Sequence, residues 1–163
     1  MANAHGIELL ERVRHQLDEI EAVFAEAHDA DLSKRCRDEH GNSAGTVAAA
    51  AAHLAEGYAR LGRFVHSTGY VPAAPVGEAR DGHAHGDDHR QAPPPATVAD
   101  VLDLLHRVRQ PVAVLAELTD EHLDRVPANS NRFTDGHRTL HQVIDQMTRH
   151  QAAHLPAIKQ ALA

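Results

Sequence analysis

Residues 7–27 carry apolar side chains at steps of three and four, which is the period of an amphipathic helix. The first set comprises Ile7, Leu10, Val13, Leu17, Ile20, Phe24 and Ala27. We therefore expect a helix over residues 6–28. The polar stretch 29–44, which contains Gly41, Asn42 and Ser43, is expected to be a loop.

A second helix is predicted to begin near residues 44–46 and to end at about His66. Its apolar positions are Val47, Leu54, Tyr58, Leu61, Phe64 and Val65. Residues 48–52 are consecutive alanines, and alanine has the highest helix propensity. Side chains this small would also let a neighbouring helix approach closely.

Residues 69–95 interrupt the helical pattern with glycines, prolines and histidines, and we expect them to form a long flexible loop. Thr97, with Asp100 three residues later, is typical of a helix N-terminus. A third helix should follow, and Pro111 should kink or split it. Its apolar positions are Val98, Val101, Leu105, Val108, Val112 and Leu115.

Residues 119–136 are polar and are expected to form a second connection before a fourth helix over residues 137–162, distorted near Pro156. No segment shows a convincing strand pattern. Amphipathic helices must bury their apolar stripes against one another. The sequence therefore predicts an all-α fold, a four-helix bundle that forms a single domain over residues 1–163.

Composition excludes several functional classes. The 163 residues include 16 basic and 23 acidic side chains. The sequence has no cluster of basic residues that could neutralise nucleic-acid phosphates. No apolar run approaches the ~20 residues that span a bilayer, and no signal segment is apparent. We therefore expect no nucleic-acid or membrane partner and a cytoplasmic location. The single cysteine, Cys36, rules out a disulfide within the chain.

Histidine is the unusual residue, because it occurs 15 times in a chain with 3% aromatic residues. At 100° per residue, His154 and His150 lie about 20° and about 60° from Met147, the centre of the apolar stripe of the fourth helix. His53 shares a face of the second helix with Gly57. Three inward-facing imidazoles would leave open positions on a divalent metal, as catalytic sites do. Hydrogen-bonded core histidines are the alternative.

Other histidines have similar spacing but are less favoured as metal ligands. His137 and His141 lie about 80° and about 120° from the stripe centre and are expected on the flank or surface. His83, His85 and His89 fall in the long loop. We favour a disordered polar segment for that run, with metal binding or a lid over the site as alternatives.

Three further side chains are candidates for chemistry. Glu56 and Arg60 follow His53 by three and seven residues, so either could orient an imidazole or meet an anionic group, although a surface ion pair between them is favoured. The basic residues Lys34, Arg35 and Arg37 around Cys36 would lower its thiol pKa. Without a histidine partner in sequence, Cys36 is interpreted as incidental.

Segments 46–56 (TVAAAAAHLAE) and 139–158 (TLHQVIDQMTRHQAAHLPAI) resemble the DinB/YfiT-like metalloprotein superfamily, and the resemblance extends over essentially the whole chain. It implies a four-helix bundle that binds one divalent metal through three histidines. These correspond to His53, His150 and His154. Alanines replace the family's usual aromatic residues near the start of the second helix, and Leu155-Pro156 replaces its usual continuation of the last helix, so we expect a differently shaped pocket.

The resemblance also implies a function. Family members include transferases and isomerases that depend on a low-molecular-weight thiol such as mycothiol. We therefore expect a small metalloenzyme that uses zinc, with nickel or iron as alternatives, a thiol co-substrate and a small electrophilic substrate. A non-catalytic metal-binding or stress-associated module is the runner-up, and a scaffold without metal is a third hypothesis. The oligomeric state stays open, with a homodimer among the alternatives.

Overall fold

The computed structural model describes residues 3–37, 43–71 and 93–163, and the chain is mostly helical within them. Most of the predicted loop 69–95 lies outside the described residues, including His83, His85 and His89. Helix α1 spans Ala4–Ala25 and buries the predicted stripe from Leu10 to Phe24. Ile7 is 46% exposed, because the buried face at the start of α1 is formed by Gly6, Leu9 and Leu10 instead.

Helix α2 spans Val47–Ser67, close to the predicted bounds. Its N-terminus is capped by Thr46, whose hydroxyl oxygen accepts a hydrogen bond from the backbone N of Ala49 at 3.2 Å. In its first half the alanine run packs through Ala48 and Ala51, which are buried.

A proline interrupts each of the two C-terminal helical segments, and in both the preceding helix ends four residues before it. Helix α3 (Val98–Arg107) ends four residues before Pro111 and is followed by α4 (Arg109–Val112) and the 3-10 helix η2 (Ala113–Glu117). Helix α6 (Leu140–Ala152) ends four residues before Pro156, which lies in the first turn of α7 (Leu155–Leu162). A proline has no N–H to bond the carbonyl four residues earlier, and its ring clashes with that carbonyl. Both predicted distortions are confirmed.

The helix N-termini follow the sequence signals. Thr97 and Asp100 form the predicted reciprocal cap of α3, with the backbone N of Thr97 donating to Asp100 Oδ2 at 3.0 Å and that of Asp100 to Thr97 Oγ1 at 3.1 Å. Thr139 and Gln142 cap α6 in the same way. A short helix, α5 (Asp120–Asp124), lies in the polar connection predicted for residues 119–136.

The prediction that no strand forms was wrong. After a 3-10 helix, η1 (Asp29–Ser33), strands β1 (Arg35–Arg37) and β2 (Ser43–Thr46) pair antiparallel, with Arg35 opposite Thr46. A strand of three or four residues is too short to show a period in the sequence. Cys36 is fully buried between the exposed Arg35 and Arg37. Burial raises the pKa of the Cys36 thiol, contrary to the lowering expected from its basic neighbours.

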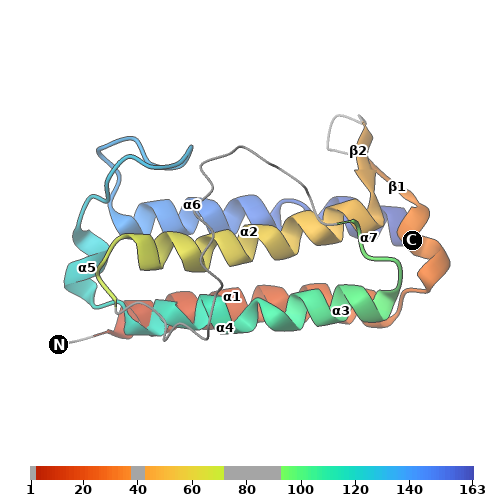
Figure 1. The fold of residues 1–163 in the computed structure, drawn as a ribbon, viewed down its shortest axis with the longest axis horizontal. Helices are drawn as coiled ribbons and strands as arrows, with labels where there is room; N and C mark the ends of the chain where they lie inside the picture. Colours follow the sequence, from red (N-terminus) through yellow and green to blue (C-terminus); the bar gives the residue numbers. More distant parts are fainter. Residues whose placement is uncertain (1–2, 38–42, 72–92) are drawn as a thin grey trace, which may run out of the picture.

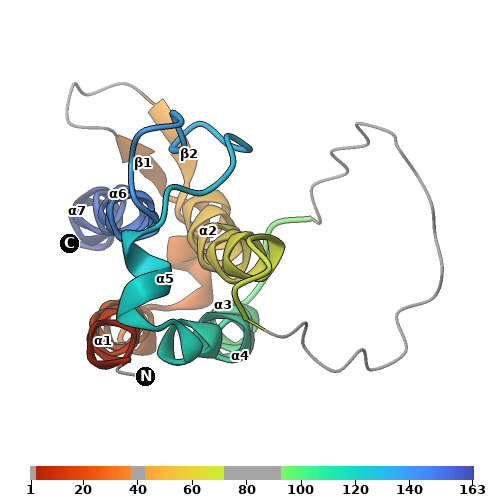
Figure 2. The same ribbon diagram turned by 90° about the vertical axis from the view of Figure 1, so that its left-hand side faces the viewer.

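The helices form two layers in the described residues (Figure 1). One layer contains α2 beside α6 and α7, and the other contains α1 beside α3 and α4. Viewed along the helices, α5 crosses one end, and the connection from α5 to α6 lies over the outer side of α2 and α6, away from α1 (Figure 2). The β1–β2 hairpin lies at the other end, where β1 contacts α7.

A continuous apolar core fills the space between the layers, with Tyr58, Phe24, Leu54 and Leu115 among its largest fully buried side chains. The Tyr58 hydroxyl donates a hydrogen bond to Gln16 Oε1 at 3.0 Å. No helix in the described ranges combines the length and the apolar composition that crossing a bilayer would require.

The close contact between α2 and α4 can be tested at Gly62. A Cβ at this position would lie 2.5 Å from the carbonyl oxygen of Pro111, a backbone atom that cannot swing away. Gly62→Ala is therefore expected to lower the free energy of unfolding by about 1–3 kcal/mol in urea denaturation. Alanine in place of glycine otherwise favours a helix by about 1 kcal/mol. An unchanged or increased stability would contradict this packing.

Candidate metal centre

Three histidines from two neighbouring helices meet at one point. His53 lies on α2, His150 on α6, and His154 at the turn between α6 and α7. Within the described residues, one ligand nitrogen from each lies within 4.8 Å of the other two. His150 Nε2 and His154 Nε2 are 3.4 Å apart, and the ring of His53 lies 4.8 Å from that of His154 between centroids. The structure thus brings the predicted set together.

Close packing of α2 against α6 allows the three histidines to meet. Gly57, one helical turn after His53, faces the side chain of Gln151, and a Cβ at position 57 would overlap that amide. Gln151 is buried, and its Oε1 has no hydrogen-bond partner within the described residues. Because Gln151 lies between His150 and His154 in the sequence, this contact holds the two histidine-bearing segments side by side.

The histidines lie at the rim of the helix interface, which corrects the prediction that they face the core. His53 is exposed, and His150 and His154 are half-buried. At this end of α2 the buried face runs through Ala51 and Leu54, so His53 falls on its flank. On α6, Val143 is fully buried two turns before His150 on the same face, Met147 is 7% exposed, and His150 is half-buried, so exposure increases along this face towards the histidines. The imidazoles therefore meet solvent on their outer side.

The expected surface histidines are confirmed as such. His137 is exposed in the connection before α6, and its backbone N donates to Asp135 Oδ1 at 2.9 Å. His141 is half-buried on the flank of α6, with its ring 6.4 Å from that of His5 between centroids. Neither belongs to the three-histidine group.

The electrostatic environment keeps the three imidazoles neutral. Burial, followed by the positive charges that His53 and His150 would carry, lowers the pKa of His154 to about 4. Burial and the guanidinium of Arg132 lower the pKa of His150. Burial, Arg60 and Arg132 lower that of His53, and only Glu56 opposes them. Each neutral imidazole has one unprotonated nitrogen, whose lone pair can coordinate a metal ion.

The donor set fits a divalent ion. Two nitrogens bound tetrahedrally to zinc at ~2.0–2.1 Å lie about 3.3 Å apart, which is close to the 3.4 Å between the Nε2 atoms of His150 and His154. Three imidazole donors suit zinc, nickel and iron. The described residues contain no other group of three or more histidine, cysteine or acidic side chains with this convergence.

Sequence reasoning missed two residues that border the centre. Arg132 Nη2 lies 2.6 Å from His150 Nε2, and the guanidinium stacks on Phe133 with its Cζ 4.7 Å from the ring centroid. The Phe133 ring is also 5.8 Å from that of His150. These residues precede His150 by 18 and 17 positions in a polar connection, so no helical spacing could have associated them with it.

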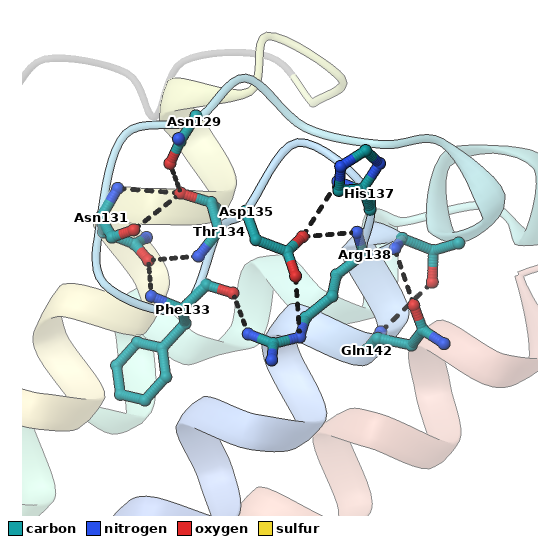
Figure 3. A network of polar contacts seen from close by, with 9 residues as sticks. Asn129, Asn131, Phe133, Thr134, Asp135, His137, Arg138 and Gln142 are labelled. Atoms are coloured by element: carbon teal, nitrogen blue, oxygen red, sulfur yellow. Dashed lines mark hydrogen bonds and ion pairs between the residues drawn. The ribbon is translucent and has the colours of Figure 1, made fainter.

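Hydrogen bonds from side chains to the backbone brace the connection that carries these residues (Figure 3). Asn131 Oδ1 accepts from the backbone N of Phe133 at 2.8 Å and of Thr134 at 3.2 Å. Thr134 Oγ1 accepts from the backbone N of Asn131 at 3.0 Å, and Arg138 Nη1 donates to the Phe133 carbonyl at 3.1 Å. Together they hold the backbone on both sides of Arg132.

The two catalytic candidates on α2 form the surface ion pair that was favoured for them. Arg60 Nε lies 3.0 Å from Glu56 Oε1, and Arg63 Nη2 lies 2.6 Å from the same oxygen. All three side chains are exposed, and none has a hydrogen bond to the three histidines within the described part of the chain. Glu56 and Arg60 affect the centre through their charge on His53.

Two surface cavities lie elsewhere in the described residues. One, of about 580 Å³, lies between α1 and α3 beside Asp18 and His106. The other, of about 260 Å³, lies beside Tyr58 and Pro156. Neither cavity is lined by any of the three histidines. Arg132 and Phe133 border the centre at His150, and His53 is exposed to solvent.

Comparisons of the chain with protein-family models, with curated proteins and with solved structures find no match. The interpretation of the centre therefore depends on its own geometry and chemistry.

The low pKa of His154 predicts a dependence of stability on pH in metal-free protein. Between its ordinary pKa of 6.5 and the folded value of about 4, the unfolded chain binds a proton that the folded chain does not. The free energy of unfolding should therefore fall as the pH drops through this range, by up to about 1 kcal/mol per unit because the ring is partly solvated.

The measurement is urea unfolding with EDTA from pH 4 to 7.5, comparing the parent with His154→Gln. The variant should lose part of the slope, whereas His137→Gln, which removes an exposed histidine, should keep it. Equal slopes in the parent and His154→Gln would show that His154 titrates normally.

Proposed function

We propose that this chain is a small metalloenzyme in which His53, His150 and His154 hold one divalent metal ion. Zinc is the expected ion, with nickel or iron as alternatives. The observation that carries the proposal is the convergence of three neutral imidazole nitrogens within 4.8 Å of one another. Such a set, without a fourth protein ligand among the described residues, is the donor pattern of a site that keeps positions for substrate.

The proposed architecture is a DinB-like four-helix bundle. Its four helical segments would be α1, α2, the α3–α4–η2 segment and the α6–α7 segment. The contacts of α1 with α3 and η2, and of α2 with α6 and α4, support this arrangement. The metal would then lie between the second and fourth helical segments. The resemblance in segments 46–56 and 139–158 implies the same location.

The proposed reaction is thiol-dependent transfer, addition or isomerisation on a small electrophile. A divalent ion at this centre supplies a Lewis acid that lowers the pKa of a thiol or water, or polarises a carbonyl or an epoxide. The geometry supports an open metal site, and the resemblance alone supports the use of a thiol such as mycothiol.

The chain's own residues would contribute position and access. The i,i+4 spacing of His150 and His154 places both rings over one turn of helix, and Gly57 keeps α2 close enough for His53 to join them. The Phe133 ring, 5.8 Å from that of His150, would cover one side of the centre. The exposed side of His53 leaves a path for a small molecule to enter from solvent.

A non-catalytic metal-binding module is the second candidate, and one observation favours it. The centre is at the surface, and neither described cavity includes it. An enzyme usually encloses its substrate in a concave site. Turnover, rather than metal content, therefore separates the two candidates.

Metal content tests the centre itself. Protein purified without an affinity tag should hold one equivalent of a divalent metal by elemental analysis. His53→Ala, His150→Ala and His154→Ala should each lose most of it, because two imidazoles are left as ligands. His137→Ala, an exposed histidine before α6, is the matched control and should retain the full equivalent.

A triple variant with His83, His85 and His89 changed to alanine tests the histidine-rich run separately. One equivalent in that variant would assign the metal to the three converging histidines, and loss of metal there alone would contradict the proposal. Metal-loaded protein is then assayed with a panel of thiols and electrophiles. Stoichiometric metal without thiol-dependent turnover would favour the binding module.

A further inference from the structure

Arg132 differs from most described arginines in its partners. Arg60 and Arg63, for example, are paired with Glu56. Arg132 has no carboxylate within ion-pair distance in the described residues, and it lies against an imidazole nitrogen and a phenyl ring instead. A guanidinium has five N–H donors, and its hydrogen bond to His150 Nε2 uses one of its terminal nitrogens. A guanidinium with unused N–H donors therefore lies directly beside the metal centre.

The position of Arg132 is built into the fold. Asn131 before it and Thr134 after it exchange hydrogen bonds with the backbone of the same turn, and Thr134 is only 7% exposed. The stacking of the guanidinium on Phe133 adds a cation–π contact. A braced turn loses little conformational entropy when its side chain binds a ligand.

Arg132 and a metal ion compete for the same atom. In this structure the guanidinium donates to His150 Nε2, which is also the nitrogen that faces His154. One imidazole lone pair cannot serve both a hydrogen bond and a coordinate bond. When His150 takes up a metal ion, Arg132 must release that nitrogen while its braced backbone keeps it close by.

A loaded centre would carry an excess of positive charge. The Arg132 guanidinium lies 2.6 Å from His150 Nε2, and a divalent ion would add two more positive charges beside it. Glu56, three residues after His53 on α2, is already paired with both Arg60 and Arg63. The described residues thus leave the positive charge uncompensated, and a bound anion would compensate it.

We infer that Arg132 is the anion-binding residue of this centre and that the substrate is a small molecule with a carboxylate, held between the guanidinium and the metal ion. This inference rests on the metal site proposed above. The planar fork of arginine matches the two oxygens of a carboxylate. The Phe133 ring beside the guanidinium offers an apolar surface to the remainder of a small substrate.

The inference predicts coupling between cation and anion. Removing the guanidinium frees His150 Nε2 and removes a repelling charge, so Arg132→Gln should bind Co²⁺ at least as tightly as the parent does. A carboxylate should strengthen Co²⁺ binding by the parent and have little effect on the variant. By linkage, Co²⁺ should strengthen carboxylate binding by the same factor.

The experiment uses Co²⁺-loaded full-length protein, whose visible absorption reports on the metal's surroundings, titrated with benzoate. Benzamide is the neutral probe of the same shape. Arg132→Gln should weaken benzoate binding roughly tenfold or more, and Arg132→Lys should weaken it less. Arg149→Gln is the matched control, because Arg149 neighbours His150 in sequence but is exposed and pairs with Asp145 at 2.8 Å. It should bind benzoate as the parent does.

The outcomes separate the two proposals. One equivalent of Co²⁺ with the same benzoate affinity in the parent and Arg132→Gln, or equal responses to benzoate and benzamide, would overturn the role of Arg132 and leave the metal site intact. A parent that takes up no Co²⁺ would overturn the metal site, and the anion site would fall with it.

Discussion

The close approach of α2 to α6 is the constraint on which the candidate centre depends. Gly57 has no side chain, and the space is taken by the buried amide of Gln151. Because Gln151 lies between His150 and His154, the same contact that packs the helices also brings His53 within reach of both rings. A larger residue at position 57 would separate the helices or expel Gln151, and in either case the three imidazoles would no longer be held together.

The rim position of the histidines explains their combination of properties. Enough of each ring is desolvated to keep it neutral, with the pKa of His154 lowered to about 4, yet His53 is exposed. A centre in the core would have equally neutral imidazoles but no route for a ligand from solvent. At the rim, the same lone pairs that are available to a metal ion can also be reached by a substrate.

The turn that carries Arg132 makes the centre chemically asymmetric. One side holds the guanidinium and the phenyl ring of Phe133, and the other side lies open beside His53. The hydrogen bond from Arg132 to His150 Nε2 places a positive charge at the nitrogen that a cation would also need. Metal binding and the position of Arg132 are therefore linked through a single atom.

The amino-acid sequence by itself determined the long helical segments, the cap of α3, both proline breaks and the i,i+4 histidine pair, because each depends on residues within a few positions of one another. The sequence did not predict that His53 is exposed, because the neighbouring helix decides which side of a helix is buried. The β1–β2 hairpin was missed because each strand is too short for a period. Only the tertiary structure placed Arg132 against His150, because a braced turn and a helix 18 residues later meet through packing, which no local spacing encodes.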